Sequence, residues 1–188
     1  MSSIRPFSAT DLFELNSINL DPLTENFYLY FYLQYLSEWP SLFYKIVSPT
    51  NNVQGYMLAK TEGKGKDWHA HISAVTVNPN YRRIGLASTL CSSLERFTEN
   101  EPYEVYFIDL FVRCNNKLAI VLYEKLGYSI YRRVVGYYGD YESKMNRNKI
   151  DDEIDAFDMR KALKRDINRE SVRADGRKFN VLPNEIVF

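Results

Sequence analysis

The segment from His69 to Leu94 constrains the fold more than any other part of this chain. It reads HAHISAVTVNPNYRRIGLASTLCSSL, and it passes from an apolar strand through an arginine- and glycine-containing loop into a helix. The helix is indicated by Leu86, Leu90 and Leu94, which recur at helical spacing on one face. A strand, loop and helix joined in this way direct several backbone N–H groups of the helix start toward one point, where they can bind an anion. The segment therefore predicts an α/β domain with a phosphate or pyrophosphate site in the loop.

Length and charge limit the class of protein. The chain has 188 residues, with 24 Lys and Arg against 24 Asp and Glu, and so lacks the basic surplus typical of nucleic-acid binding. Its apolar runs fall short of the roughly 20 residues that cross a bilayer, and no secretory leader is expected. Cys91 and Cys114 lack the C-x-x-C spacing of a redox or metal motif, which favours two buried thiols in a reducing compartment. We expect a soluble cytoplasmic protein that contacts neither a membrane nor nucleic acid directly.

One domain and a short tail account for the length of the chain. We expect the domain to span residues 1–163, and residues 164–188 to form a polar tail that is disordered or packed on a partner. Within the domain, residue patterns and turn signals predict strands at 4–7, 42–47, 53–59, 69–77, 104–111, 128–135 and 156–163. They also predict helices from Thr10, over 26–39, over 86–98 and over 115–126, the last with Leu118, Val121 and Leu122 facing inward.

The second predicted helix, Asn26–Trp39, is apolar and aromatic on nearly every side. Such a helix must be covered, either by the core of its own domain or by another polypeptide, and the sequence leaves both possibilities open. Aromatic residues make up 15% of the chain and cluster again between Tyr123 and Tyr141. Clustered tyrosines of this kind line either a binding groove or the edge of a core.

Two short motifs, in the right order and separated by one predicted strand, connect the loop to a known superfamily. The first follows the pattern [RQ]-x-x-G-x-[GA], and the second is a helix that starts at an asparagine and ends in Leu-Gly-Tyr. The matching residues are Arg82, Gly85 and Ala87 for the first motif, and Asn116, Tyr123 and Leu126-Gly127-Tyr128 for the second. Together they resemble the acetyl-CoA-binding core of the GNAT superfamily of N-acetyltransferases. That resemblance implies an α/β fold in which a mixed, mostly antiparallel sheet is flanked by helices and splayed around acetyl-CoA.

Longer blocks narrow the resemblance to the catalytic subunits of NatB-type N-terminal acetyltransferases. The blocks include FYLQYLSEWP, WHAHISAVTV and DLFVRCNNKLAIVLYEKLGYSIYRRV, and together they span Ile18 to Leu163. The resemblance implies acetyl transfer from acetyl-CoA to the α-amine of nascent chains that begin Met-Asp, Met-Glu, Met-Asn or Met-Gln. It also implies a helical-repeat auxiliary subunit that docks the enzyme at the ribosome. A GNAT enzyme acting on lysine or a small amine, and a non-catalytic acetyl-CoA-binding scaffold subunit, are the alternatives.

The cofactor residues implied by the resemblance lie on the strand, in the loop and on the second helix. On the strand, a backbone N–H near Val75 or Val77 would polarise the thioester carbonyl. On the helix, Asn116 would orient the CoA arm and Tyr123 would protonate the departing thiolate, with a structural role as the alternative for each. The loop residues that would hold the pyrophosphate are Arg82, Arg83, Ile84, Gly85, Leu86 and Ala87.

Neither a strong base nor a metal ion is required by the implied reaction. An α-amine has an unperturbed pKa of about 8, so a useful neutral fraction exists near pH 7 and a weak base or a water relay suffices. The general base is therefore not identified from the sequence. The chain has two histidines with no cysteine or carboxylate cluster near them in the sequence, so we expect no metal site.

The substrate side must solve a recognition problem, because Asp and Asn, or Glu and Gln, share size and one carbonyl-type oxygen but differ in charge. A pocket that accepts all four needs neutral or switchable donors in place of a buried arginine. We expect Asp109 on the next strand to pair with Arg113 or Arg132. Each candidate for the peptide site also has a structural alternative, and Phe27 lacks the hydroxyl of the tyrosine usual in relatives. The candidates are His71 and Ser73, which share one strand face with His69, the loop pair Tyr137 and Tyr138, and Glu25 and Phe27 before the aromatic helix.

Overall fold

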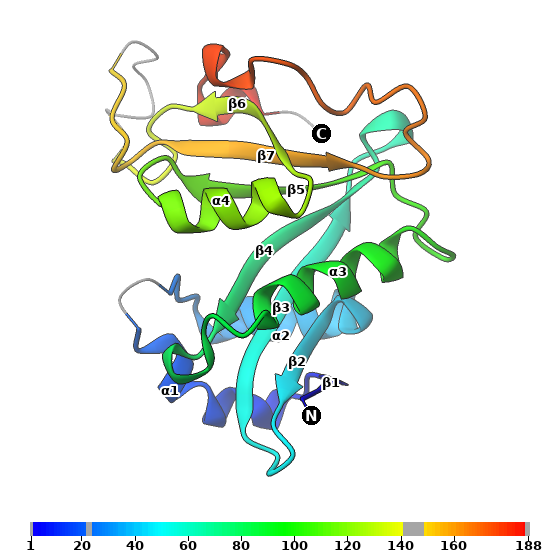
Figure 1. Cartoon of the computed structure of the whole chain (residues 1–188), viewed down its shortest axis with the longest axis vertical. Helices are drawn as coiled ribbons and strands as arrows, with labels where there is room; N and C mark the ends of the chain where they lie inside the picture. The colour runs from blue at the N-terminus through cyan, green and yellow to red at the C-terminus, as the bar shows by residue number, and fades with distance from the viewer. Residues whose placement is uncertain (1, 22–23, 141–148, 187–188) are drawn as a thin grey trace.

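A sheet of eight strands forms the centre of this computed structural model, which describes residues 2–21, 24–140 and 149–186. The strands follow the order β1-β2-β3-β4-β5-β7-β6-β8 (Figure 1). Neighbouring strands pair antiparallel, except that β4 with β5 and β6 with β8 are parallel. The predicted mixed, mostly antiparallel sheet is therefore confirmed. The bounds are β1 Ser3–Pro6, β2 Phe43–Val47, β3 Val53–Glu62, β4 His69–Val77, β5 Phe107–Arg113, β6 Ser129–Val134, β7 Ala156–Ala162 and β8 Asn180–Val181.

Helices cover both faces of the sheet, with α3 and α4 on one face and α2 on the other (Figure 1). On the first face, Leu90 and Leu94 of α3 are fully buried against the sheet. On the other face, Tyr32 and Tyr35 of α2 pack in a second cluster. Since a fully buried leucine contributes roughly 1.5–3 kcal/mol, both clusters hold their helices firmly on the sheet. The helices are α1 Asn16–Asn19, α2 Leu29–Glu38, α3 Leu86–Thr98 and α4 Lys117–Lys125, with short 3-10 helices at Ala9–Glu14, Pro40–Leu42, Gly65–Asp67, Pro79–Tyr81, Gly176–Lys178 and Pro183–Glu185. Among the described residues, no helix combines the length and the apolar character that crossing a bilayer requires.

Helix α4 presents a different face to the core from the one predicted. The side chains of Leu118 and Val121 are 74% and 47% exposed, whereas Ile120 and Tyr123 are buried. The prediction of Leu118 and Val121 as inward-facing residues was therefore wrong. Residues 118–123 are all apolar or aromatic and so surround the helix, and the face that meets the sheet is the one that carries Ile120 and Tyr123.

The C-terminal segment returns to the sheet and extends it by one strand. Arg133 and Val134 of β6 pair in parallel with Asn180 and Val181 of β8. The backbone of Gly176 approaches the same strand so closely that a Cβ there would lie 1.8 Å from a β6 carbonyl oxygen, a contact only glycine permits. The expectation of a disordered tail is therefore wrong for residues 164–186. Contact of this segment with a partner stays a prediction.

Candidate active site

Strands β4 and β5 separate at the centre of the sheet. They pair in parallel only from His69 opposite Phe107 to Ile72 opposite Leu110. Beyond this point β4 follows β3 and β5 follows β7, so the two strands diverge. The divergence begins at a β-bulge at Ser73. Ile72 and Ala74 pair with successive residues of β3, and Ser73 between them has no opposite residue on that strand. The bulge therefore lies at the start of the splay.

A cleft of about 670 Å³ fills the space between the diverging strands, a volume within the usual range for small-molecule sites. Because β5 no longer covers it, the free edge of β4 offers backbone hydrogen-bonding groups to a ligand. Val75 borders the cleft as predicted, whereas the cleft lining on β4 ends at Thr76, one residue before Val77. The lining comprises residues 24–25, 72–76, 110–113 and 115–119, with Tyr123 and Tyr138.

The loop between β4 and α3 has the geometry of an anion site. Gly85 precedes α3 with φ +86°, and a Cβ built at this position would meet nothing within 4 Å, so the space in front of the backbone is open. The first hydrogen bond of the helix runs from the Thr89 N–H to the Gly85 carbonyl at 3.0 Å. The N–H groups of the preceding turn are therefore oriented along the helix axis without an acceptor inside the helix.

The two arginines of this loop differ in their surroundings. Arg82 donates from Nε to the Val77 carbonyl at 3.1 Å, and its Nη2 lies 3.1 Å from Oδ1 of Asp21. It therefore ties the loop to the end of β4. Arg83 is exposed and has a left-handed backbone with φ +68°, a conformation that costs a non-glycine residue about 1–3 kcal/mol. The exposed hydrophobic side chain of Ile84 follows, 64% exposed.

Asn116 and Tyr123 meet at the cleft from one helix. The side chain of Asn116 accepts a hydrogen bond from the Ala119 N–H at 3.1 Å, which makes it the cap of α4. Tyr123 lines the cleft while its ring packs edge-on against Tyr128, with 5.6 Å between the ring centroids. Burial raises the pKa of Tyr123 well above that of a free tyrosine, so its hydroxyl stays protonated at neutral pH.

A continuous wall of side chains borders the cleft on the β5 side. Nη2 of Arg113 lies 3.3 Å from Oε1 of Glu25, and the same guanidinium sits 3.9 Å above the ring of Tyr138. Tyr138 contacts Tyr137 edge-on at 4.9 Å, and Tyr137 stacks on Phe111 at 4.8 Å. The structure thus brings together three of the predicted peptide residues, Glu25, Tyr137 and Tyr138. Burial raises the pKa of Tyr137 to about 12, so its hydroxyl is protonated at neutral pH.

Phe111 and Arg113 were not predicted as site residues, although a signal for them exists. They follow Asp109 at alternate positions along β5, and alternate residues of a strand share one face. The polar and aromatic side chains of Asp109, Phe111 and Arg113 thus define one face of β5, and this pattern indicates all three as site candidates.

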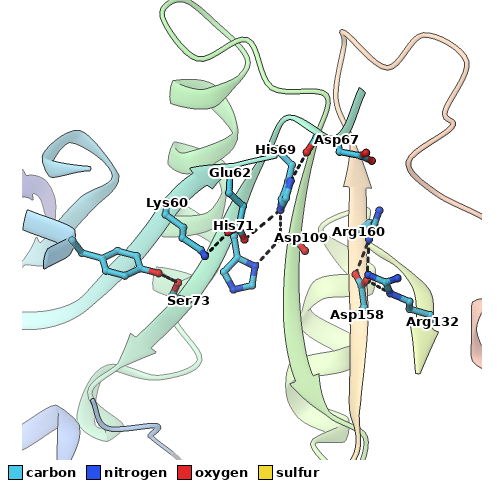
Figure 2. A network of polar contacts seen from close by, with 11 residues as sticks. Lys60, Glu62, Asp67, His69, His71, Ser73, Asp109, Arg132, Asp158 and Arg160 are labelled. Atoms are coloured by element: carbon cyan, nitrogen blue, oxygen red, sulfur yellow. Dashed lines mark hydrogen bonds and ion pairs between the residues drawn. The ribbon is translucent and has the colours of Figure 1, made fainter. Parts of the chain in front are cut away.

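The predicted partners of Asp109 were wrong. Its carboxylate is fully buried and lies 2.8 Å from Nδ1 of His71 (Figure 2). His71 and Asp109 stand directly opposite each other in the parallel ladder, which brings their side chains together. Arg113 instead pairs with Glu25, and Arg132 donates from Nε to Asp158 at 2.8 Å. The histidine predicted for the peptide site therefore has a buried carboxylate behind it.

Ser73 and Phe27 occupy different surroundings. The hydroxyl of Ser73 lies 2.6 Å from that of Tyr35 on α2, so the serine at the bulge is tied to the aromatic helix. Phe27 is half-buried and stacks on Phe31 with 4.5 Å between centroids, inside the cluster under α2. Ser73 belongs to the cleft lining, whereas Phe27 lies in the neighbouring cluster.

The structure places Glu62 beside the two histidines, a carboxylate that the sequence did not associate with them. One ligand-type atom from each of Glu62, His69 and His71 lies within 4.8 Å of the others. Lys60 donates a hydrogen bond to the carboxylate of Glu62, so the lysine ammonium already balances the negative charge of this carboxylate. The expectation that no metal binds stays a prediction.

Comparison with known proteins agrees with this architecture. The model of the acetyltransferase (GNAT) family matches residues 10–128. The N-terminal acetyltransferase B complex catalytic subunit NAT3 of Saccharomyces cerevisiae is 58% identical over 196 aligned residues, which cover all of both chains. The corresponding catalytic subunit naa20 of Schizosaccharomyces pombe is 50% identical, again over the full length of both.

Solved structures show the same fold. A chain of the NatB acetyltransferase complex bound to a bisubstrate inhibitor superposes with a TM-score of 0.88 at 60% identity and covers 99% of each chain. The Naa20 protein of Chaetomium thermophilum, solved with a bisubstrate analogue, superposes with a TM-score of 0.85 at 42% identity and 97% coverage of each. The chain therefore belongs to the acetyltransferase (GNAT) family, in its branch of N-terminal acetyltransferase B catalytic subunits.

Proposed function

We propose that this chain transfers the acetyl group of acetyl-CoA to the α-amine of nascent proteins that begin Met-Asp, Met-Glu, Met-Asn or Met-Gln. It does so in the cytoplasm as the catalytic subunit of a NatB-type complex. The observation that carries the proposal is the cleft between β4 and β5, because a strand edge, Tyr123 and the wall containing Glu25 and Tyr138 all border it. The full-length match to catalytic subunits of N-terminal acetyltransferase B supports the same reaction.

The residues present fit acetyl-CoA. The open space in front of Gly85 and the N–H groups at the start of α3 suit a pyrophosphate, and the exposed guanidinium of Arg83 can reach it. The cleft volume of about 670 Å³ suits the narrower arm that carries the acetyl group. Leu86 and Ala87 place a helix start behind the anion, and Asn116 faces the arm from α4. When bound, acetyl-CoA supplies an acetyl group activated as a thioester.

The chemistry assigned to the chain is modest. The free edge of β4 at Val75 presents a backbone N–H to the acetyl carbonyl and so stabilises the negative charge that develops on its oxygen. Tyr123 donates a hydrogen bond to the departing sulfur. A phenol whose pKa is raised is a weaker acid than a free thiol, but the same desolvation raises the proton affinity of a thiolate in the cleft. Tyr123 therefore remains a competent donor at this position.

The peptide enters from the side of the aromatic wall. Glu25 accepts a hydrogen bond from the substrate amine, and Tyr137 and Tyr138 supply protonated hydroxyls for the peptide backbone. His71 and Ser73 read the second side chain through an imidazole and a hydroxyl, both of which can switch between donor and acceptor. Phe27, half-buried in its cluster, leaves one edge for the initiator methionine.

An auxiliary subunit covers the outer face of α2. Large apolar side chains remain solvent-exposed there and along the preceding segment, which an isolated domain does not need. They are Phe13 (85% exposed), Leu20 (81%), Tyr28 (79%), Tyr30 (68%), Leu29 (61%) and Leu33 (43%). A helical-repeat subunit offers a long concave surface for such a helix and docks the pair at the ribosome. Helix α2 is thus covered on both sides, by the core of its own domain on one side and by the partner on the other.

Peptide acetylation tests the reaction. The chain, alone and co-expressed with its auxiliary subunit, is incubated with acetyl-CoA and peptides that begin Met-Asp, Met-Asn, Met-Lys or Ser-Glu but share all other residues. Mass spectrometry should show α-amine acetylation of the first two only, and none on a Met-Asp peptide with a blocked α-amine. Acetylation of an internal lysine, or equal rates on all four peptides, would contradict the proposed function.

Paired substitutions test the docking surface. Leu29→Asp should abolish co-purification with the auxiliary subunit, because it places a charge in a buried apolar interface. Val121→Asp is the matched control, since Val121 is 47% exposed on α4, which covers the opposite face of the sheet from α2. If both variants co-purify like the wild type, α2 is not the docking surface.

A further inference from the structure

His69 is a buried histidine with a hydrogen-bond acceptor at Nδ1 and two carboxylates near Nε2. Its side chain is fully buried and stacks flat on Phe107, with 4.7 Å between centroids. Nδ1 lies 2.6 Å from the Asp67 carbonyl oxygen, and Nε2 lies 3.6 Å from Oε1 of Glu62 and 3.5 Å from Oδ1 of Asp109 (Figure 2). An imidazole with an acceptor at one nitrogen and negative carboxylates near the other is stabilised as the doubly protonated cation. Burial alone would lower the pKa of His69, but Glu62, Asp109 and Asp67 outweigh it, and the pKa is raised.

Asp109 stands between the two histidines of the chain. The same oxygen, Oδ1, lies 2.8 Å from Nδ1 of His71 and 3.5 Å from Nε2 of His69. Burial opposes ionisation of Asp109, yet the charge and hydrogen bond of His71 and the charge of His69 hold its pKa below the usual range. Because a carboxylate only accepts, the proton of the short contact resides on Nδ1 of His71. The second ring nitrogen of His71, Nε2, is then the one that remains for other hydrogen bonds.

Other charged groups around these histidines are matched among themselves. Lys60 on β3 pairs with Glu62, and on the far side of β5 the carboxylate of Asp158 pairs with Arg132 and Arg160. Tyr35 and Ser73, on α2 and β4, approach the same face without charge. The titratable groups closest to His71 are therefore the Asp109 carboxylate directly beside it, the Glu62 carboxylate, which already pairs with Lys60, and His69 behind Asp109.

We propose that His69 and Asp109 are positioning residues that set the charge of His71 and thereby how evenly the site accepts acidic and amide side chains at the second position of the substrate. The inference rests on the proposed function, in which His71 contacts that side chain. The inference makes His69 and Asp109 determinants of substrate specificity. Because His69 is completely buried, it acts without touching the substrate.

The two protonation states of His71 suit the two classes of substrate. With Nδ1 donating to Asp109, a neutral His71 offers the Nε2 lone pair to the NH₂ group of Asn or Gln. With one proton taken up from solvent, Nε2–H donates to the carboxylate of Asp or Glu. An uncompensated Asp109 would stabilise the cation strongly and favour acidic side chains. A positive charge at His69 offsets the negative charge of Asp109, so the balance between these two groups determines which class of side chain His71 favours.

Two substitutions should change the preference in opposite directions. The measured quantity is kcat/KM for a Met-Asp peptide divided by kcat/KM for a Met-Asn peptide, with the complex of this chain and its auxiliary subunit. His69→Gln removes the offsetting charge, so the ratio should rise roughly tenfold. Asp109→Asn removes the carboxylate that stabilises the His71 cation, so the ratio should fall roughly tenfold. Loss of packing alone would lower both rates together and leave the ratio unchanged.

Controls separate this charge effect from general damage. Asp11→Asn removes a buried carboxylate from a remote pair with Lys45 and should leave the ratio unchanged. In a His71→Gln background, neither His69→Gln nor Asp109→Asn should shift the ratio. A shift of the two single variants in the same direction, or none, would overturn the inference. If the wild type acetylates neither peptide, the proposed function itself is wrong, which is a different result.

Nitrogen NMR of the wild type provides a test that needs no variant to fold. The chain contains two histidines, so ring-¹⁵N-histidine labelling of this chain in the complex gives two imidazole spin systems. At pH 7, His69 should show two protonated ring nitrogens, and His71 should carry its proton on Nδ1. A neutral His69, or a His71 protonated on Nε2 alone, would overturn the inference.

Discussion

The loop before α3 and the wall of side chains on β5 both belong to the candidate active site, but they are constructed from different parts of the protein. The loop uses backbone N–H groups and the φ +86° of Gly85, all within a few residues of each other in the chain. The wall uses side chains that the fold brings together, such as Arg113 and Glu25, which are separated by 88 residues. A backbone site binds any compact anion, whereas a side-chain site can distinguish related peptides. Variants should therefore affect cofactor and peptide independently.

The largest effect is expected where both sides of the site meet. Tyr123→Phe should lower kcat about 100-fold, because the departing sulfur loses its hydrogen-bond donor. The dissociation constant for acetyl-CoA, measured by calorimetry, should change little because the ring still packs against Tyr128. An unchanged kcat would show that another group serves the sulfur.

A substitution in the loop should affect the cofactor alone. Gly85→Val forces a branched side chain into the left-handed region, at a cost of about 1–3 kcal/mol, and places its Cβ in the space reserved for the anion. We expect KM for acetyl-CoA to rise at least about tenfold while KM for the peptide stays constant. A rise in the peptide KM alone would mean that the two sides are not independent.

The reverse result is expected from the wall. Arg113→Ala removes both the contact with Glu25 and the cation above Tyr138, each worth up to about 1 kcal/mol at an exposed site. KM for a Met-Asp peptide should rise about fivefold without a change in KM for acetyl-CoA. Arg5→Ala, at an exposed arginine on β1, is the control and should change neither constant.

The smallest effect concerns stability and pH. Burial opposes ionisation of Glu62, but the nearby His69 ring and the hydrogen bond from Lys60 hold its pKa at about 2. A lowered carboxyl pKa adds stability above the unfolded value of about 4.5, and this contribution is lost as pH falls toward 2. The Tm of Glu62→Gln should therefore lie slightly below that of the wild type at pH 7, and the gap should close on acidification. A gap that is constant from pH 7 to pH 3 would exclude this role for the carboxylate.

Strand bounds and the loop before a helix could be predicted from the sequence, because each depends on residues within one short segment of the chain. Alternating residues gave β4 the observed bounds His69–Val77, and the Arg-Gly loop lies before α3 as its residues indicated. The inward face of α4 was not predictable, because residues 118–123 are all apolar or aromatic and, at about 100° per residue, they lie on every side of the helix. Leu118 at 74% exposure shows the consequence.

Contacts between strands were harder to predict, because they depend on register. Asp109 has arginines near it in the sequence pattern, yet it meets His71 because the two stand opposite each other in a parallel ladder. Parallel pairing of β4 with β5 follows from the whole topology and from no single motif. The same limit applies to Glu25 and Arg113, whose contact requires the segment before α2 to reach the end of β5.

The bulge at Ser73 also changes the parity of β4. Side chains of a regular strand alternate, so Ile72 and Val75 would face opposite sides of the sheet. One extra residue reverses the order, and both pack on the cluster under α3, while Ala74 joins the cluster under α2. If Ser73 were instead paired with β3 in a regular ladder, every following residue of β4 would exchange faces, whereas deleting Ser73 would remove the bulge and keep the faces as they are. The position of a single unpaired serine thus determines which side of the sheet the second half of β4 serves.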